Sequence, residues 1–295
     1  MHPELRYFLQ QLLNGLSVGS TYALMAVGYT MVYSCLRLIN FVHGDIYVFG
    51  TFVALTVWKL GLPVPAAILA GCIAGAVIGM GVERIAYRPL RHSHRIMSII
   101  SGLGAAMVLR TTSQLVWGPQ TLPFFELGVR RAIDLSGLRI MSQQLQVVGT
   151  AVICMVVFTL LLSRTKLGKA TQCVMQDIEL SRMVGIPVNK IIPMVYALGG
   201  LLAVVGGILF SSYYDALNIG MGLLGTIKAW AAAALGGMGS LYGAFLGGII
   251  LGVGETLAGA YLHQGFRSAF GYLVIILILL WRPHGLFGKQ RVEKV

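Results

Sequence analysis

The chain has 295 residues, of which 57% are hydrophobic and 11% are charged, and its mean hydropathy is +0.80. Soluble domains average about 45–50% apolar and about 25% charged residues, so this composition indicates a protein whose main solvent is lipid. The formal net charge is +12. A nucleic-acid-binding protein would carry such charge on one soluble face, whereas here the basic residues form three short groups between apolar runs. Composition therefore argues against a soluble protein and against nucleic acid as a partner.

Apolar segments follow one another along the whole chain. Because every backbone polar group inside hydrocarbon must be paired within the protein, we expect these segments to be helices. They lack the alternating pattern of an outer-membrane barrel. Since one span needs about 20 residues, the sequence predicts an all-α, polytopic bundle of about eight to ten transmembrane helices in one domain, 1–295, with short pieces broken or re-entrant. The segments are 8–34, 41–60, 64–83, 96–117, 145–163, 190–213, 222–236, 240–262 and 267–281.

The three basic groups predict the topology. They lie at 84–95, 164–190 and 282–295, and the positive-inside rule places them in the cytoplasm together with the C-terminus. The polar stretch 118–144 then becomes an external loop. The side of the N-terminus stays open, because three spans before Arg84 would put Met1 outside and a broken second segment would reverse that.

Glycine recurs at a spacing of four residues. Gly71, Gly75 and Gly79 form one such series, and two more lie at 239–247 and 248–252. This small-xxx-small spacing allows two helix backbones to approach closely in lipid, and we expect it to serve packing within the subunit for the first series. The denser run at 236–240 predicts an interrupted helix, which is tolerated in a membrane where it lines a cavity or contacts protein.

No catalytic, nucleotide-binding or metal-binding constellation is recognisable. The stretch 167–170 (LGKA) lacks the leading glycine and the Ser or Thr after Lys of a phosphate-binding loop. The four cysteines are scattered without the spacing of a zinc site. We therefore expect no cofactor in this chain. If it moves a solute with ATP, the ATP and Mg²⁺ are bound by a separate subunit.

Polar and ionisable residues inside or near the apolar segments mark candidates for the translocation pathway, because such residues in a membrane usually belong to a pathway or an ion pair. Lys228 and Glu255 fit a position at the membrane border as well as a position in the pathway. Arg110 and Asp215 are expected at span borders. The pathway candidates are Asn40, His43, Asp45, Thr226, Lys228 and Glu255, with a helix break expected at 40–45.

The segment 163–190 predicts one amphipathic helix of about four turns in a cytoplasmic loop. Its apolar residues recur at helical spacing from Ala170 onward, Gly185 falls at the position of a C-terminal cap, and Pro187 stops the helix. Such a helix lies either on the lipid surface or on a partner protein. Its mixed polar face favours the partner.

Motifs spread over nearly the whole chain resemble the permease subunits of ABC importers for branched-chain amino acids, of the LivH type. They are NGL at 14–16, GSTYAL at 19–24, GYTMVY at 28–33, INFVHGD at 39–45, ERIAYRPLR at 83–91, IKA at 227–229, LGGMGS at 235–240 and RPHGL at 282–286.

The resemblance implies a multi-pass protein of the cell inner membrane. Its partners would be a homologous second permease subunit, two cytoplasmic ATPase subunits and a periplasmic substrate-binding protein. The helix at 168–186 would be the coupling element that docks on the ATPase. The resemblance assigns this coupling to Gly168, Ala170, Asp177, Gly185 and Ile186.

Leucine, isoleucine and valine are the expected substrates. Urea, short amides and other amino acids remain alternatives, because related importers carry them and the helix motifs do not separate them. A stand-alone secondary transporter or channel fits the composition equally well but gives no reason for the amphipathic loop helix. A membrane enzyme would need a convergent acid, base or nucleophile set, which is lacking.

Overall fold

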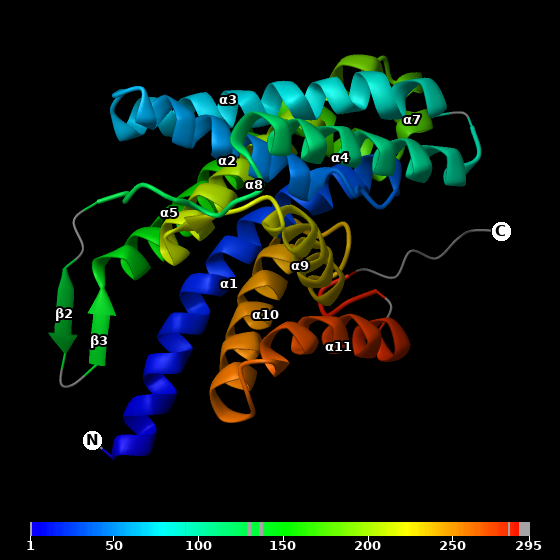
Figure 1. The fold of residues 1–295 in the computed structure, drawn as a ribbon. Helices are drawn as coiled ribbons and strands as arrows, with labels where there is room; N and C mark the ends of the chain where they lie inside the picture. Colours follow the sequence, from blue (N-terminus) through cyan, green and yellow to red (C-terminus); the bar gives the residue numbers. More distant parts are fainter. Residues whose placement is uncertain (1, 92, 129–130, 136–137, 283, 289–295) are drawn as a thin grey trace.

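The computed structural model describes residues 2–91, 93–128, 131–135, 138–282 and 284–288. Pro283 of the RPHGL motif, Arg130 of the external loop, and Lys289, Arg291 and Lys294 of the third basic group lie outside these residues. The described part is almost wholly helical, which confirms the all-α prediction (Figure 1). The helices are α1 Pro3–Leu36, α2 His43–Lys59, α3 Val64–Val82, α4 Arg95–Trp117, α5 Ser142–Arg164, α6 Lys166–Gln176, α7 Ile178–Met183, α8 Val188–Tyr214, α9 Met221–Gly236, α10 Leu241–Tyr261 and α11 Phe266–Trp281.

Helix α1 runs through the centre of the bundle. Every residue from Ser17 to Val32 is buried, and the helix packs against α5, α8, α9 and α10. The crossing with α10 needs glycine, since a Cβ on Gly19 would lie 2.8 Å from the Cα of Ile249. Gly248 and Gly252 meet α1 in the same crossing, so the predicted small-residue spacing serves packing inside this chain.

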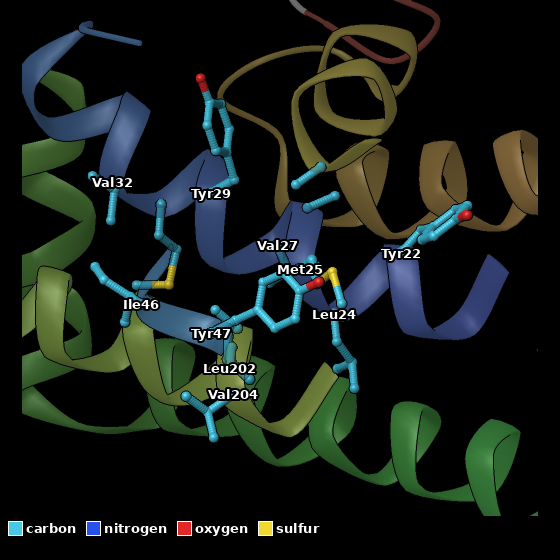
Figure 2. Packing of buried hydrophobic residues seen from close by; sticks show 14 of the residues in the cluster. Tyr22, Leu24, Met25, Val27, Tyr29, Val32, Ile46, Tyr47, Leu202 and Val204 are labelled. Carbon is cyan, nitrogen blue, oxygen red and sulfur yellow. The ribbon is translucent and has the colours of Figure 1, made fainter. Parts of the chain in front are cut away.

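Helices α2, α3 and α8 form a second tightly packed group. A Cβ on Gly71 would lie 2.8 Å from the carbonyl oxygen of Gly50 in α2, and one on Gly75 would lie 2.8 Å from that of Gly200 in α8. This confirms the predicted packing role of the glycines at 71–79. Figure 2 shows the side chains that fill the space between α1, α2 and α8, with Tyr47 of α2 beside Met25 of α1.

Apolar faces on α3, α4 and α5 point away from the bundle. Only 28%, 22% and 28% of their most apolar stretches are buried, against 67% for α8. Leu69, Ile100 and Ile153 illustrate the exposed positions, at 62%, 62% and 64% exposure. Exposed apolar surface of this extent is typical of helices that contact lipid or another membrane subunit.

Five helical stretches of the described residues are long and apolar enough by themselves to cross a membrane. They are Val64–Leu90, Arg95–Trp117, Ser142–Arg164, Val188–Tyr214 and Leu241–Tyr261. The expected count also included α1, α2, α9 and α11. Helix α1 carries buried Ser and Thr side chains that lower its hydropathy, which α1 tolerates because protein rather than lipid surrounds it. The other three have 16 or 17 residues.

The start of α1 and a β-hairpin share one end of the bundle, here called the hairpin end (Figure 1). The hairpin consists of β2 Ala132–Leu135 and β3 Leu138–Met141. Gln10 Nε2 of α1 donates to the Arg139 carbonyl oxygen at 2.9 Å, and the Arg139 N–H donates to Gln10 Oε1 at 3.1 Å. A second small sheet, β1 Leu122–Pro123 with β4 Ala216–Leu217, ties the segment before α9 to the 118–144 loop.

The first two basic groups lie at the opposite end, here called the basic end, together with α6 and α7 (Figure 1). In the ERIAYRPLR motif, Glu83 and Arg91 form a buried ion pair, and Arg91 Nη1 donates to Asn189 Oδ1 beside the start of α8 at 3.2 Å. The segment after α11 also returns here, where the Leu286 N–H donates to the Leu235 carbonyl oxygen at 2.8 Å. The start of α1 at Pro3 therefore lies at the end of the bundle opposite the first two basic groups.

Candidate functional site

A buried ion pair joins α9 to α10. Lys228 Nζ of α9 contacts Glu255 Oε1 of α10, and their side chains are only 9% and 1% exposed. The Tyr22 hydroxyl of α1 donates to Glu255 Oε2 at 3.2 Å. Gly271 of α11 leaves room for the pair, since a Cβ there would lie 2.6 Å from Glu255 Oε1 and 2.8 Å from Lys228 Nζ. Four helices thus meet around one compensated pair of charges, which would be costly in a membrane if left single.

A cavity of about 220 Å³ opens beside this ion pair. It is smaller than the roughly 300–1,000 Å³ of pockets for drug-sized ligands, which suits it to a small solute. Its wall combines aromatic and apolar side chains with three charged ones. The lining residues are Tyr22, Met25, Tyr47, Phe210, Tyr214, Met221, Leu224, Gly225, Lys228, Glu255 and Arg267.

Arg267 of α11 brings a second positive charge to the cavity. It donates a hydrogen bond to the Tyr214 hydroxyl, and its guanidinium carbon lies 5.7 Å from the centroid of the Tyr214 ring. Both contacts hold the guanidinium without neutralising it. Phe210 packs against Tyr214 with centroids 4.7 Å apart and stacks on Tyr22 at 6.2 Å. The cavity therefore has a continuous aromatic wall between Arg267 and the ion pair.

The predicted helix break at 40–45 is confirmed, because α1 ends at Leu36 and α2 begins at His43. Asn40 Oδ1 accepts hydrogen bonds from the Val42 N–H and the Tyr87 hydroxyl, each at 3.2 Å. His43 Nε2 lies 3.1 Å from the Met25 carbonyl oxygen. Because a carbonyl only accepts, Nε2 carries the hydrogen. These contacts fix the chain where it turns back into the bundle.

Thr226 of α9 caps the first turn of α2. Its hydroxyl oxygen accepts from the Gly44 N–H at 2.9 Å and donates to the Gly222 carbonyl oxygen at 3.1 Å. The first N–H groups of a helix have no partner within it, so this hydroxyl supplies one from another helix. The approach is close, since a Cβ on Gly222 would lie 3.0 Å from Asp45 Oδ1.

Asp45 forms a two-pronged ion pair with Arg110 of α4. Arg110 Nε lies 3.0 Å from Asp45 Oδ1, and Nη2 lies 3.1 Å from Oδ2. The Asp45 side chain is 3% exposed and that of Arg110 is 32% exposed. The interpretation of Arg110 as a border residue missed this contact, in which it neutralises a buried carboxylate.

The six pathway candidates fall into two clusters rather than one. Lys228 and Glu255 line the cavity, whereas Asn40, His43, Asp45 and Thr226 surround the start of α2. Helix α9 carries one member of each cluster, with Thr226 and Lys228 two positions apart. Tyr22, Tyr47 and Arg267 were missed as lining residues. Arg267 opens the last apolar segment and could have been noticed as a charge at its edge.

The cytoplasmic-loop prediction needs one correction, because 168–186 holds two helices instead of one. Asp177 ends α6 in an extended conformation (φ −154°, ψ 119°), and its side chain then accepts from the N–H groups of Glu179 and Leu180 at 2.9 and 3.0 Å. Asp177 is therefore the N-cap of α7, where a carboxylate competes with helix continuation. Gly185 follows α7 with φ +81°, as predicted for a C-terminal cap.

The two short helices are anchored on one side and exposed on the other. Gly168 packs on the end of α5, where a Cβ would meet the backbone of Leu161 and Leu162. Thr171 and Val174 are buried. Ala170 and Ile186 are half-buried. The exposed side carries an apolar surface, here called the α7 surface, made of Leu180 (61% exposed), Met183 (81%) and Val184 (73%).

Comparison with known proteins gives full-length matches. A family model described as the branched-chain amino acid transport system permease component matches residues 11–280. The chain is 38% identical to the high-affinity branched-chain amino acid transport system permease protein BraD of Pseudomonas aeruginosa, over 99% of this chain and 100% of BraD. It is 34% identical to the high-affinity branched-chain amino acid transport system permease protein LivH of Escherichia coli, over 100% of both chains.

A solved structure is similar in fold. It is described as PsaBC from Streptococcus pneumoniae in complex with Fab, with a TM-score of 0.51 over 94% of this chain and 92% of that chain. The sequence identity is 14%, so this likeness concerns the arrangement of helices alone.

Proposed function

The chain belongs to the family of branched-chain amino acid transport system permease components, and from this premise we propose that it is the transmembrane permease subunit of an ATP-driven importer of leucine, isoleucine and valine. The observation that carries the proposal is 34–38% identity over the full length to permeases named for high-affinity transport of these amino acids. Its multi-pass helical architecture fits that role.

Energy enters at the α7 surface in this proposal. The surface lies at the basic end, which is the cytoplasmic side under the positive-inside rule. Two ATPase subunits bind ATP and Mg²⁺ and dock there, one of them on α6 and α7. Gly168 anchors the pair of helices on α5, Asp177 fixes the angle between them, and Gly185 and Ile186 lead the chain back into α8. An apolar surface of this kind on a cytoplasmic loop favours a protein partner.

The remaining partners follow from the same assignment. A homologous second permease subunit completes the translocation pathway in the inner membrane. A periplasmic binding protein delivers the solute at the hairpin end. Within this chain, the solute passes the cavity beside Lys228 and Glu255, whose apolar and aromatic wall suits a branched side chain. The cluster at the start of α2 supports the pathway by holding α9 in place through Thr226.

Uptake in cells tests this function. Cells lacking their own importers receive this chain with its neighbouring genes, and a matched strain receives the same genes without it. We expect labelled leucine to enter only when this chain is present and labelled urea to enter neither strain at a raised rate. Uptake of urea without uptake of leucine would contradict the proposal.

A further inference from the structure

The cavity beside the Lys228–Glu255 pair holds an uneven number of charges. Lys228 and Arg267 are cationic and Glu255 is the single carboxylate among its lining residues. Glu255 is already in contact with Lys228. Among the described residues, no carboxylate lies within ion-pair distance of Arg267. Its hydrogen-bond and ring contacts are with Tyr214, and the Glu255 charge acts on it from beyond ion-pair distance. Because one carboxylate serves two cations, the cavity keeps one net positive charge.

A half-buried cation of this kind favours an anionic group in the cavity, because Coulomb attraction is stronger where the surroundings are apolar. Guanidinium has a planar array of donors that matches a carboxylate with two parallel hydrogen bonds. In the same cavity, Glu255 and the Tyr22 hydroxyl supply a negative charge and an oxygen acceptor. Phe210 and Tyr214 form the aromatic part of the cavity wall.

We propose that this cavity is a binding site for an α-amino acid zwitterion within the permease itself, with Arg267 binding the carboxylate, Glu255 facing the ammonium group, and the apolar wall of Met25, Phe210 and Leu224 taking the side chain. The proposal deepens the proposed function and rests on it. It adds a second selection step, after the binding protein, that rejects solutes without a carboxylate such as urea and simple amines.

A thiol-protection experiment on the assembled importer tests this site. The four native cysteines are replaced, and a Leu224→Cys variant places a reporter in the cavity wall. Leu223→Cys is the matched control, because Leu223 and Leu224 are 48% and 49% exposed on the same helix and only Leu224 lines the cavity. Reaction with N-ethylmaleimide is followed without the binding protein, in the presence of L-leucine, isoamylamine (leucine without its carboxylate) or urea.

We expect leucine to slow the labelling of Leu224→Cys but not of Leu223→Cys, and isoamylamine and urea to leave both rates unchanged. In the Leu224→Cys background, the further substitution Arg267→Gln should raise the leucine concentration that gives half-protection by about tenfold or more. A hydrogen bond to a charged group contributes that much to binding affinity. Arg267→Lys keeps the charge and should lose less. The comparison of leucine with isoamylamine needs no change at Arg267, so it stands even where a variant fails to fold.

Equal protection by isoamylamine and leucine would overturn the assignment of Arg267, as would unchanged protection in a folded Arg267→Gln variant. Absence of labelling at Leu224→Cys in every nucleotide state would mean that the cavity is sealed and the proposal is wrong. These results leave the proposed function intact if the cysteine-free importer still accumulates leucine. Failure of leucine accumulation by the unmodified importer would instead overturn the proposed function.

Discussion

The buried ion pair between α9 and α10 allows a direct test of the energetics inside this bundle. Replacing Glu255 by Leu leaves the Lys228 ammonium buried at 9% exposure without its counter-charge and removes the acceptor of the Tyr22 hydroxyl. Breaking a buried pair on one side costs about 3–5 kcal/mol of stability, because one desolvated charge is left alone. We therefore expect Glu255→Leu to lower the free energy of unfolding by about that amount.

The double variant Lys228→Met/Glu255→Leu separates the pair from its surroundings. Apolar residues of similar size can replace a buried ion pair with little loss, so the remaining cost comes from the unsatisfied Tyr22 hydroxyl, about 1–3 kcal/mol. The double variant should thus be more stable than Glu255→Leu alone. This reversal is the signature of a buried pair, because replacements of two independent residues would add.

The assay is reversible unfolding by sodium dodecyl sulfate in mixed micelles, followed by tryptophan fluorescence and extrapolated to zero denaturant. Glu4→Leu is the control, because Glu4 is exposed in the first turn of α1 and its replacement should change stability by less than about 0.5 kcal/mol. A loss below about 1 kcal/mol for Glu255→Leu, or a double variant as unstable as the sum of the singles, would refute the reasoning from burial.

Three further changes probe packing, coupling and capping. Gly252→Leu should lower the free energy of unfolding by about 1–3 kcal/mol, because the new side chain would meet the backbone of α1. Gly104→Leu is the control, because a Cβ there has nothing within 4 Å and should cause no such loss. Equal losses in the two variants would contradict the packing role of Gly252. Asp177→Ala removes the N-cap of α7, and we expect it to reduce leucine uptake and substrate-stimulated ATP hydrolysis while membrane insertion stays normal. Unchanged transport would show that Asp177 has no role in coupling to the ATPase. Thr226→Val should lower the free energy of unfolding by about 1 kcal/mol more than Thr256→Val, because the Thr226 hydroxyl caps another helix and the Thr256 hydroxyl bonds within its own helix. Equal losses would show that the Thr226 hydroxyl does not stabilise the start of α2.

Composition and glycine patterns were enough to predict the class of fold and the places where helices are interrupted. The run of apolar segments predicted a helical membrane bundle, and the glycine-rich stretch 236–240 predicted the end of α9, where Gly237 and Gly239 have positive φ. Both signals are local, since a helix needs continuous apolar residues in lipid and a glycine needs no partner to leave the helical region.

Contacts between distant helices could not be predicted from the sequence. Lys228 and Glu255 were each recognised as charges in apolar segments, but nothing in the sequence states that they lie on facing sides of α9 and α10. Arg110 was placed at a border for the same reason, because its partner Asp45 is on another helix. Pairing of charges depends on helix packing, which a hydropathy profile does not contain.

The split between α6 and α7 has a local signal in the sequence, but the helical spacing of the apolar residues favoured one continuous helix. Asp177 precedes a short run of helix-forming residues, which is the pattern of an N-cap. The apolar stripe moves from Ile178 to Met183, a step of five that does not fit one continuous helix. Helix α1 is absent from the five most apolar long stretches because it is surrounded by protein and needs no lipid-compatible surface over Ser17 to Val32.

Solute accumulation by purified components tests the central claim most directly. The chain is reconstituted into liposomes either alone or with the second permease, the ATPase subunits and the binding protein from its own gene cluster. The account predicts that labelled leucine accumulates only in the complete assembly and only when ATP is supplied on the side of the ATPase subunits. Accumulation of leucine by the chain alone on an ion gradient would contradict it.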